Sequence, residues 1–491
     1  MSQLVETVTG PTMADLRTAR DAAVGDLVEL RLDGVTDLDV AGALAGRRRP
    51  VIVTCRARWE GGWFDGSEDE RLAILARAAA LGAECIDVEF AAAWRDVPRS
   101  ADTRLVLSVH DFTGVPADLR QRVEAMRRAG ADVVKVAARA NQLIDCVTLR
   151  DGMGCGGDHV AIAMGAAGEI SRTCPWLFGS CWMYGGSAAP GQIAARTLLD
   201  VYRVHATGTE TALYAVGGMP LAHSASPAMH NAAFAALGMN AVFVRLETAD
   251  AGEFLEVADA FGLAGAAITA PLKSAFAAVS PDAASAGLNS RFGVRGDDDV
   301  AQIGALNTLR RGAGGWEGRN FDVAGFLAPL ERRGIALRGR RAAVLGAGGA
   351  ARAAAFALSR QGADVALAAR QTDRAARVAR DLGVATTAWP PSGAWDLIVN
   401  ATPVGTLPAT ADRPIDMARL QARAVYDLVY NPDPTALLLD ARARGAETIG
   451  GLEMLIAQAG CQFEWWTGQR APAGVLEAGA REWLQGVQAA A

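Results

Sequence analysis

Lysine is almost absent from this chain, so the few lysines that occur are candidates for chemistry. Only two of the 48 basic residues are lysines, Lys135 and Lys273. Arginine serves ion pairs and solubility equally well, but its guanidinium stays protonated and cannot form an imine. A lysine in an apolar site can lose its proton and act as a nucleophile or as an acid–base group. The alternative is chance survival in an arginine-rich composition.

Lys135 lies in the apolar run "ADVVKVAA", which follows Gly130. The β-branched residues of this run predict a buried strand. A lysine inside such a strand needs a partner or a function, which argues against chance. We expect burial and nearby arginines to lower the pKa of Lys135 from about 10.4 towards 7, which would make the amine a nucleophile.

Short apolar runs alternate with amphipathic stretches over the first two hundred residues. The expected strands are residues 4–9, 26–33, 50–56, 84–90, 104–110, 132–137, 159–165 and 178–184. Eight strands with intervening helices predict a (β/α)8 barrel, a fold that carries its chemistry at the carboxyl ends of the strands. Polar residues interrupt the apolar runs near those ends: Glu29, Arg31, Arg56, Glu89, His110 and Lys135. Each of them alone could form a structural ion pair, but the convergence of all six on one face favours a functional site.

The second half of the chain contains a nucleotide-binding pattern at residues 341–358, "RAAVLGAGGAARAAAFAL". A strand, a glycine turn at 346–349 and an alanine-rich helix would bring a pyrophosphate close to a helix N-terminus. The pattern reads GxGGxx and departs from GxGxxG. The next strand is followed by Arg370 and Arg374 instead of an acidic residue, which favours the 2′-phosphate of NADP.

Between the two patterned halves, residues 204–212 are small and polar and indicate a linker. After it, "HSASPAMHN" predicts a loop entering a helix, with Ser226 as a plausible N-cap. Lys273 follows a short strand and a proline turn, and Asn307 and Asp322 come later. Taken one by one, serines before a helix are usually caps and an Asp after a strand usually forms a turn.

Composition excludes several classes of protein. The net charge of −6 and the absence of a basic stripe argue against a nucleic-acid partner. The seven cysteines show no metal-ligand spacing, so we expect no metal and no disulfide framework. The N-terminal residues lack the apolar segment of a secretory signal, and no run of eighteen apolar residues could span a membrane. These features predict a soluble protein of the reducing cytoplasm.

The first half of the chain resembles the type I 3-dehydroquinate dehydratases. The strings "VELRLD", "DVEF", "LSVHDF", "VVKVA", "AIAMGAAGEISR", "FGS" and "AAPGQ" occur in the family's order, and the resemblance covers residues 1–205. It implies a Schiff base between Lys135 and the substrate ketone, proton transfer by His110 and orientation of that histidine by Glu89. It also implies that the substrate is held by Glu29, Arg31, Arg56, Arg172 and Gln192. The family's "SAPGQ" has Ala188 in place of its serine, so either Ser187 substitutes or one hydrogen bond is lost.

The second half resembles the shikimate dehydrogenases over residues 212 to about 485. The strings are "HSASPAMHN", "TAPLK", "GALNT", "GAGGA", "NATPVG" and "GLEMLIAQA". The resemblance implies a substrate-binding subdomain at 212–322, completed by 452–491, and a Rossmann-like NADP subdomain at 323–451. Lys273 and Asp322 would form the catalytic pair, and shikimate would be bound by Ser224, Ser226, Thr269, Asn307 and Gln458. NADP would be bound by Gly346, Ala347, Gly348, Gly349, Ala350, Arg370, Arg374, Asn400 and Thr402.

One departure concerns the family's "NTD", which reads "NFD" here because Phe321 precedes Asp322. We expect activity to survive with altered substrate fit or turnover. The two reactions would be consecutive, from 3-dehydroquinate to 3-dehydroshikimate to shikimate. A preference for quinate and a non-catalytic quinate-pathway regulator are the alternatives, and the retained catalytic residues argue against the regulator. A plastid protein that has lost its transit peptide would have the same sequence features.

Overall fold

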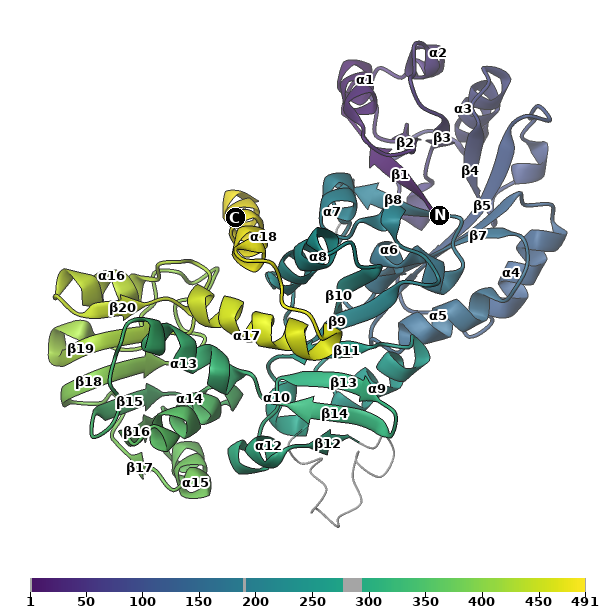
Figure 1. Ribbon diagram of the computed structural model, residues 1–491. Coiled ribbons are helices and arrows are strands. Elements are labelled where there is room, and N and C mark those ends of the chain that lie inside the picture. Colours follow the sequence, from purple (N-terminus) through teal and green to yellow (C-terminus); the bar gives the residue numbers. More distant parts are fainter. Residues whose placement is uncertain (1, 189–190, 277–293, 491) are drawn as a thin grey trace. The chain divides into compact units, whose positions relative to one another are not determined.

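A computed structural model describes residues 2–188, 191–276 and 294–490 of the chain (Figure 1). The chain divides into two units. The first contains residues 1–212, 240–248 and 256–262, and the second contains residues 213–239, 249–255 and 263–491. The first unit holds an eight-stranded sheet, and most strands of two six-stranded sheets lie in the second.

The strands of the eight-stranded sheet pair in parallel in sequence order, and β8 pairs with β1. Between β7 and β8, the backbone N–H of Cys181 donates to the carbonyl oxygen of His159 at 2.9 Å, which nearly closes the sheet. The predicted (β/α)8 barrel is confirmed. Its strands are β1 (Gln3–Val8), β2 (Leu27–Arg31), β3 (Val51–Thr54), β4 (Cys85–Glu89), β5 (Arg104–Asp111), β6 (Val133–Arg139), β7 (Asp158–Met164) and β8 (Trp182–Gly186).

The last strand begins later than the sequence pattern predicts. Pro175–Phe178 forms a short 3-10 helix, because a proline suits the first helical turn and Gly179, at φ 66°, ends it. The expectation of a strand over 178–184 was therefore wrong at its start. The barrel helices are α1 (Met13–Ala22), α2 (Val40–Leu44), α3 (Glu68–Ala80), α4 (Leu119–Arg128), α5 (Asp145–Met153), α6 (Ile170–Thr173) and α7 (Ala195–Asp200).

Side chains inside the barrel form layers because alternate residues of a strand point to the same face. An apolar layer contains Val5, Leu27, Ile52, Cys85, Val106, Val133, Val160 and Trp182, one residue from each strand. Two residues further along, the next layer contains Thr7, Glu29, Thr54, Asp87, Ser108, Lys135, Ile162 and Tyr184. Most of this second layer is polar, although all of its polar side chains are buried. The barrel therefore places a layer of ionisable side chains on an apolar floor.

The first six-stranded sheet is mixed and has the order β10-β9-β11-β13-β14-β12. β9 and β11 are parallel, and β13 runs antiparallel to β11, so β13 begins where β11 ends. The strands are β9 (Ala212–Gly218), β10 (Ala241–Glu247), β11 (Gly265–Ile268), β12 (Arg295–Gly296), β13 (Thr308–Gly312) and β14 (Gly315–Arg319). The helices of this region are α8 (Ser226–Ala236), α9 (Ala251–Ala260), α10 (Leu272–Ala275), α12 (Asp298–Ile303) and α13 (Asp322–Arg332).

The second six-stranded sheet is parallel throughout, with the order β17-β16-β15-β18-β19-β20, which confirms the Rossmann-like fold. Its strands are β15 (Arg341–Leu345), β16 (Asp364–Ala368), β17 (Ala385–Thr386), β18 (Gly393–Asn400), β19 (Leu420–Asp427) and β20 (Glu447–Ile449). Its helices are α14 (Gly349–Arg360), α15 (Thr372–Leu382) and α16 (Ala436–Ala443). The C-terminal helices α17 (Gly451–Thr467) and α18 (Val475–Ala490) pack against α13 and α8, respectively.

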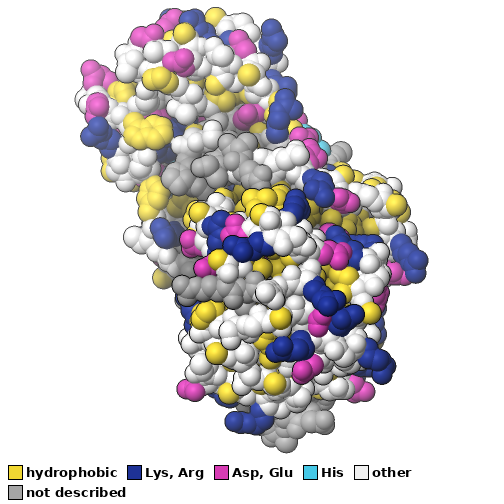
Figure 2. Space-filling view, turned by 90° about the vertical axis from the view of Figure 1, so that its left-hand side faces the viewer, with side chains coloured by type: hydrophobic (Ala, Val, Ile, Leu, Met, Phe, Trp, Pro, Cys, Tyr) yellow, Lys and Arg dark blue, Asp and Glu magenta, His cyan; other side chains and the backbone are white. Residues whose placement is uncertain are grey.

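The described residues can be compared with the features of membrane-spanning helices and of strongly charged surfaces. No helix among them combines the length and the apolar character that crossing a membrane requires. On the face drawn in Figure 2, acidic and basic side chains are interspersed and do not separate by sign.

Candidate active sites

Lys135 lies in the polar layer of the barrel, where two carboxylates surround it. Its Nζ donates to Asp87 Oδ2 at 2.9 Å and to Glu29 Oε1 at 3.3 Å. Burial by itself lowers the pKa of this lysine, but the two carboxylates outweigh burial and raise that pKa above its usual value. The expectation that burial and nearby arginines lower the pKa of Lys135 was therefore wrong. In the free enzyme Lys135 is a paired ammonium ion.

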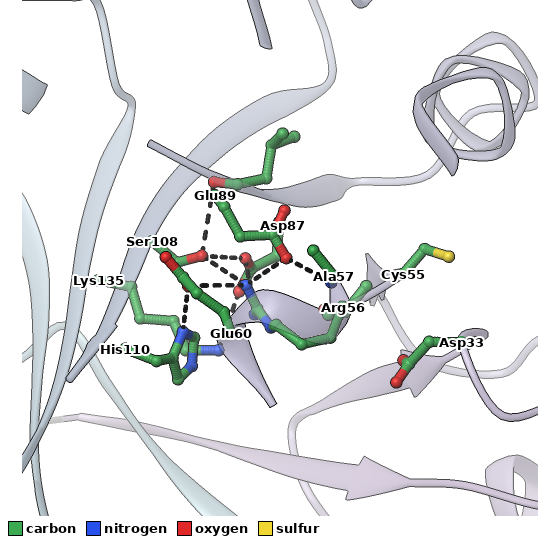
Figure 3. A network of polar contacts seen from close by, with 12 residues as sticks. Asp33, Cys55, Arg56, Ala57, Glu60, Asp87, Glu89, Ser108, His110 and Lys135 are labelled. Atoms are coloured by element: carbon green, nitrogen blue, oxygen red, sulfur yellow. Dashed lines mark hydrogen bonds and ion pairs between the residues drawn. The ribbon is translucent and has the colours of Figure 1, made fainter. Parts of the chain in front are cut away.

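A buried network holds the carboxylate of Asp87 in place (Figure 3). Arg56 Nη2 donates to Asp87 Oδ1 at 2.9 Å, and Ser108 Oγ donates to the same oxygen at 2.6 Å. Burial raises the pKa of Asp87, yet Arg56 and Lys135 lower it by more, so the carboxylate stays ionised. The sequence interpretation did not single out Asp87, although its place two residues before Glu89 on one strand puts it on the same face.

His110, near the end of β5, has a different partner from the one expected. Its Nδ1 lies 2.8 Å from Oε2 of Glu60, in the 3-10 turn that follows β3. Glu89 instead accepts hydrogen bonds from Arg56 at 3.0 Å and from the Ala57 N–H at 2.9 Å, and pairs with Arg71 at 2.7 Å. The prediction that Glu89 orients His110 was wrong, because Glu89 supports the arginines below the site. Glu60 lies four residues after Arg56 and carries the opposite charge, and this spacing could have indicated Glu60 as a site residue.

The protonation states of His110 and Glu60 depend on each other. Burial, together with Arg56 and Lys135, lowers the pKa of His110 well below its ordinary value. Burial raises the pKa of Glu60 to about 8, although Arg56 opposes that rise. At neutral pH the pair therefore consists of an uncharged imidazole and a protonated Glu60. The two groups titrate as one unit.

A cavity of about 230 Å³ opens above Lys135. Most of the predicted dehydratase residues line it: Glu29, Arg31, Arg56, His110, Lys135, Arg172 and Gln192. Asp33 fixes the guanidinium of Arg31 through two hydrogen bonds of 2.9 and 2.8 Å. Ala188 lines the cavity, while Ser187 is exposed and does not line it. This arrangement favours the loss of one substrate hydrogen bond over replacement by Ser187. The two residues after Ala188 in "AAPGQ" lie outside the described residues.

The second lysine also pairs with a carboxylate. Lys273 Nζ donates to Asp322 Oδ2 at 2.5 Å, and Asn307 Nδ2 donates to Asp322 Oδ1 at 2.9 Å. Asn307 Nδ2 also donates to Gln458 Oε1 at 3.1 Å. The four side chains come from α10, the residue before β13, α13 and α17, so the fold brings together residues that are far apart in sequence.

The remaining predicted substrate-binding residues lie at the same edge of the sheet. Ser224 and Ser226 follow β9, Thr269 follows β11, and these parallel strands end together. Ser226 is the first residue of α8, and Ala225 occupies the N-cap without a side-chain hydrogen bond, so the prediction that Ser226 caps this helix was wrong. Its hydroxyl is therefore not committed to capping.

The ring of Phe321 packs against Trp465. The two rings meet edge-on, with the ring centroids 5.7 Å apart. The backbone N–H of Phe321 donates to Asn307 Oδ1 at 2.8 Å, which helps to orient the amide that holds Asp322. The aromatic residue is thus compatible with the arrangement of the lysine–carboxylate pair.

The glycine turn between β15 and α14 fits a dinucleotide pyrophosphate. Gly346 has φ 121°, and a Cβ there would lie 2.9 Å from a backbone oxygen, so a side chain is excluded. Gly348, the N-cap of α14, makes no side-chain cap and has no neighbouring atom within 4 Å of a Cβ built on it. Arg370 and Arg374 follow β16 and are exposed. The turn leaves N–H groups and space for phosphate oxygens.

Asn400 differs from the other predicted cofactor residues because it is fully buried. Its Nδ2 donates to Asp427 at 2.8 Å, and its Oδ1 accepts from the N–H of Thr402 at 3.0 Å and from the Thr402 hydroxyl at 2.7 Å. These hydrogen bonds tie its side chain to the loop after β18. The prediction that Asn400 binds the cofactor stays a prediction.

The fold and the two sites define a chain with two enzyme domains, a lysine-centred barrel and a dinucleotide-binding dehydrogenase. The type I 3-dehydroquinase family matches residues 5–209. The shikimate dehydrogenase substrate-binding domain matches residues 216–288, and the shikimate 5′-dehydrogenase C-terminal domain matches residues 451–478. The predicted boundaries at 205, 212, 322 and 451 stay predictions.

Known proteins resemble the chain over both halves. The chloroplastic bifunctional 3-dehydroquinate dehydratase/shikimate dehydrogenase of Arabidopsis thaliana is 31% identical over 516 residues, which cover 95% of this chain and 82% of that protein. The NADP(+) shikimate dehydrogenase of Symbiobacterium thermophilum is 41% identical over 55% of this chain and 93% of its own length. A crystal structure of shikimate dehydrogenase in complex with NADP+ shares 30% identity and a TM-score of 0.50, and covers 56% of this chain and 96% of that one. The chain belongs to the family of bifunctional 3-dehydroquinate dehydratase/shikimate dehydrogenases.

Proposed function

We propose that this chain catalyses two consecutive steps of the shikimate pathway, each with one of its two lysines. The barrel dehydrates 3-dehydroquinate to 3-dehydroshikimate through an imine on Lys135, and the second unit reduces this product to shikimate with NADPH. The observation that carries the proposal is the position of each lysine, at a carboxylate in the site where its domain would bind substrate. Arginine could not form the imine.

In the dehydratase, Lys135 supplies the electron sink and His110 moves the protons. The protonated imine makes the neighbouring C–H bond acidic, so the neutral imidazole of His110 can remove that proton. The same histidine then returns a proton to the departing hydroxyl group, which leaves as water. Arg31 and Arg172 line the cavity and provide positive charge for the substrate carboxylate. Hydrolysis of the imine releases the product and restores Lys135.

Borohydride reduction tests the dehydratase mechanism. With 3-dehydroquinate present, borohydride should fix a substrate-derived adduct on Lys135, detected as a mass increase of the peptide containing that residue, and dehydration should stop. Lys135→Ala should give neither adduct nor dehydration. An active Lys135→Ala variant, or a wild-type enzyme without the adduct, would exclude the imine.

In the dehydrogenase, Lys273 and Asp322 act at the substrate carbonyl. The glycine turn at 346–349 would hold NADPH, which would supply the hydride when bound. As the carbonyl oxygen gains charge, the Lys273 ammonium donates a proton to it, while Asp322 keeps that ammonium oriented. Asn307 donates to the other carboxylate oxygen of Asp322, and Gln458 accepts from the same Asn307 amide.

Replacement of Lys273 tests this assignment. Lys273→Ala should lower kcat for reduction of 3-dehydroshikimate by roughly 10²–10⁴-fold, because a positioned general acid contributes about that much. The Kd for NADPH, measured by fluorescence, should change little. Near-normal turnover would return Lys273 to the class of surviving surface lysines.

The departure at Phe321 favours testing quinate as a second substrate. Phe321 replaces the family's polar residue before Asp322, and its ring packs against Trp465, so the fit of the substrate ring is open to change. We expect shikimate to be preferred. The ratio of kcat/KM for shikimate to that for quinate, measured with the same cofactor, decides between the two substrates.

We further propose that the protein acts in the cytoplasm and has no nucleic-acid partner. None of the seven cysteines, all of which lie among the described residues, forms a disulfide bond, which suits a reducing compartment. The interspersed charges in Figure 2 offer no basic stripe on that face for a phosphate backbone. Cell fractionation and a gel-shift assay with duplex DNA test these two points.

A further inference from the structure

We infer that Asp87, assisted by Glu29, is the counter-ion that keeps the Lys135 imine protonated during dehydration. The inference rests on the proposed function, because it requires an imine on Lys135. It assigns a catalytic role to a residue outside the group of His110, Lys135 and the substrate-binding arginines.

Geometry places Asp87 at the reacting nitrogen. Its Oδ2 accepts from Lys135 Nζ at 2.9 Å, while its Oδ1 is occupied by Arg56 and Ser108. Asp87 has no exposed surface and Lys135 is 4% exposed, so water screens their interaction poorly. Since Arg56 and Ser108 fix one oxygen of Asp87, the other stays directed at the nitrogen when the ammonium becomes an imine.

The other groups around the nitrogen explain why a counter-ion is needed. The charged or titratable side chains that interact with Lys135 are Asp87, Glu29, Tyr184, Arg56 and His110. Arg31, Glu60 and Arg172 line the same cavity. The arginines disfavour a further positive charge, and Glu60 is protonated at neutral pH because burial raises its pKa. The ring of Tyr184 lies under the nitrogen, with Nζ 4.1 Å from its centroid, and adds a weaker attraction. The full negative charges at the nitrogen therefore come from Asp87 and Glu29.

Imine formation leaves the total positive charge of the reacting groups unchanged. The ammonium of Lys135 first passes one proton to neutral His110, and the amine attacks the ketone carbon to form a C–N bond. The carbonyl oxygen takes protons from the amine and from His110, the C–O bond breaks, and water leaves. An ammonium and a ketone thus give a protonated imine and water, with one positive charge before and after. Asp87 pairs with that charge whenever it lies on the nitrogen of Lys135.

A protonated imine is a stronger acid than an ammonium ion, so it is the species that most needs the carboxylates. Only the protonated form withdraws electrons strongly enough to acidify the neighbouring C–H bond. An opposite charge within about 4–6 Å shifts a pKa by roughly 1–3 pH units. Removing the charge of Asp87 should therefore let the imine lose its proton at a pH about 1–3 units lower.

The test is reductive trapping by cyanoborohydride, which reduces a protonated imine much faster than a neutral one. The full-length enzyme is incubated with 3-dehydroquinate and cyanoborohydride between pH 6 and pH 10, and the adduct on Lys135 is quantified by mass spectrometry. We expect the alkaline midpoint of trapping to lie about 1–3 pH units lower in Asp87→Asn than in the wild type. The alkaline limb of dehydratase turnover should move with it.

Glu89→Gln is the matched control. Glu89 is another buried carboxylate on β4, but it pairs with arginines and makes no contact with Lys135. This variant should keep the alkaline midpoint of the wild type even if its total turnover falls. A wild-type midpoint in Asp87→Asn, or an equal shift in Glu89→Gln, would overturn the inference.

Two further outcomes separate the inference from the proposed function. If the wild type yields no adduct at any pH, the imine itself is excluded. If Asp87→Asn fails to fold, as judged by its thermal unfolding curve, Glu29→Gln carries the test. Glu29 lies 3.3 Å from Nζ, so this variant should move the midpoint in the same direction by a smaller amount. An unchanged midpoint in Glu29→Gln would overturn the inference that the two carboxylates keep the imine protonated.

Discussion

At the scale of single residues, the Glu60–His110 pair should set the pH dependence of dehydration at its acid limb. Because burial raises the pKa of Glu60 to about 8, the pair keeps an extra proton below that pH. Above it, Glu60 is ionised and accepts from Nδ1–H, which leaves Nε2 of His110 free as a base. We expect kcat/KM to rise with pH to a plateau above about 8.

Glu60→Gln removes this ionisation. The amide oxygen of Gln can still accept from Nδ1–H, so His110 is in its base-competent tautomer at every pH at which its imidazole is uncharged. We expect the acid limb of the kcat/KM profile to move to lower pH, with a lower plateau because the imidazole has lost its ionic partner. An unchanged acid limb would mean that another group controls it.

The same residue predicts how the stability of the barrel changes with pH. The folded-state pKa of Glu60, about 8, exceeds its unfolded value of 4.5, so the folded state binds this proton more tightly. The contribution of Glu60 to the free energy of unfolding is thus complete below pH 4.5 and is lost as the pH rises through about 8. Between pH 5 and pH 8, the midpoint temperature of thermal unfolding should fall less steeply with pH in Glu60→Gln than in the wild type.

Arg370 should decide the choice of cofactor. It is exposed just after β16, where the adenosine ribose of a dinucleotide lies, and no acidic residue stands there to accept bonds from NAD. One charge-assisted hydrogen bond to a 2′-phosphate contributes roughly 1.5–3 kcal/mol, a preference of about 10- to 150-fold. Arg370→Ala should raise the KM for NADPH by about that factor and leave the KM for NADH nearly unchanged. Equal effects on both cofactors would make Arg370 an ordinary surface residue.

At the scale of elements, the turn between β15 and α14 serves two purposes. A Cβ on Gly349 would lie 2.9 Å from Cβ of Lys273, so this glycine lets the nucleotide turn approach the catalytic lysine. Gly349→Ala should displace Lys273 and lower kcat for reduction by roughly 10- to 100-fold. Gly348→Ala is the control, because a methyl group there meets no protein atom within 4 Å and should act mainly on the KM for NADPH.

The layers of the barrel show the same dependence of a site on its elements. Each polar residue of the second layer is two positions after an apolar residue of the first, so strand register places every ionisable group at one height. Thr7 and Thr54 hold Glu29 through hydrogen bonds of 2.7 and 2.9 Å. The strands therefore fix the carboxylates before any substrate binds.

At the scale of the whole molecule, the two activities should be separable by mutation. The residues of each site lie within one unit of the chain. Lys135→Ala should abolish dehydration and leave the kcat for added 3-dehydroshikimate within about twofold of the wild type. Lys273→Ala should have the reverse effect on the two activities.

Mixing the two variants extends this prediction. If 3-dehydroshikimate diffuses freely, an equimolar mixture of Lys135→Ala and Lys273→Ala should convert 3-dehydroquinate to shikimate, monitored by NADPH absorbance. Its steady-state rate should approach that of the wild type at the same concentration of active sites. A mixture that forms shikimate far more slowly would indicate transfer of the intermediate within one chain.

The sequence by itself determined the barrel, the nucleotide-binding fold and the two lysines. These features are local: alternation along a strand, a strand–glycine turn–helix pattern, and the survival of lysine where arginine cannot do the chemistry. The start of β8 was misplaced because a proline turn and a strand share the same apolar composition.

Only the tertiary structure decided which groups act on one another. Lys135 meets Asp87 and Glu29, which are 48 and 106 residues away in sequence, and their charges reverse the direction in which burial alone would shift its pKa. His110 meets Glu60, 50 residues away, in place of the nearer Glu89. Electrostatic interactions depend on distance and burial in space, and these follow from barrel closure and strand register, which no local pattern of residues specifies.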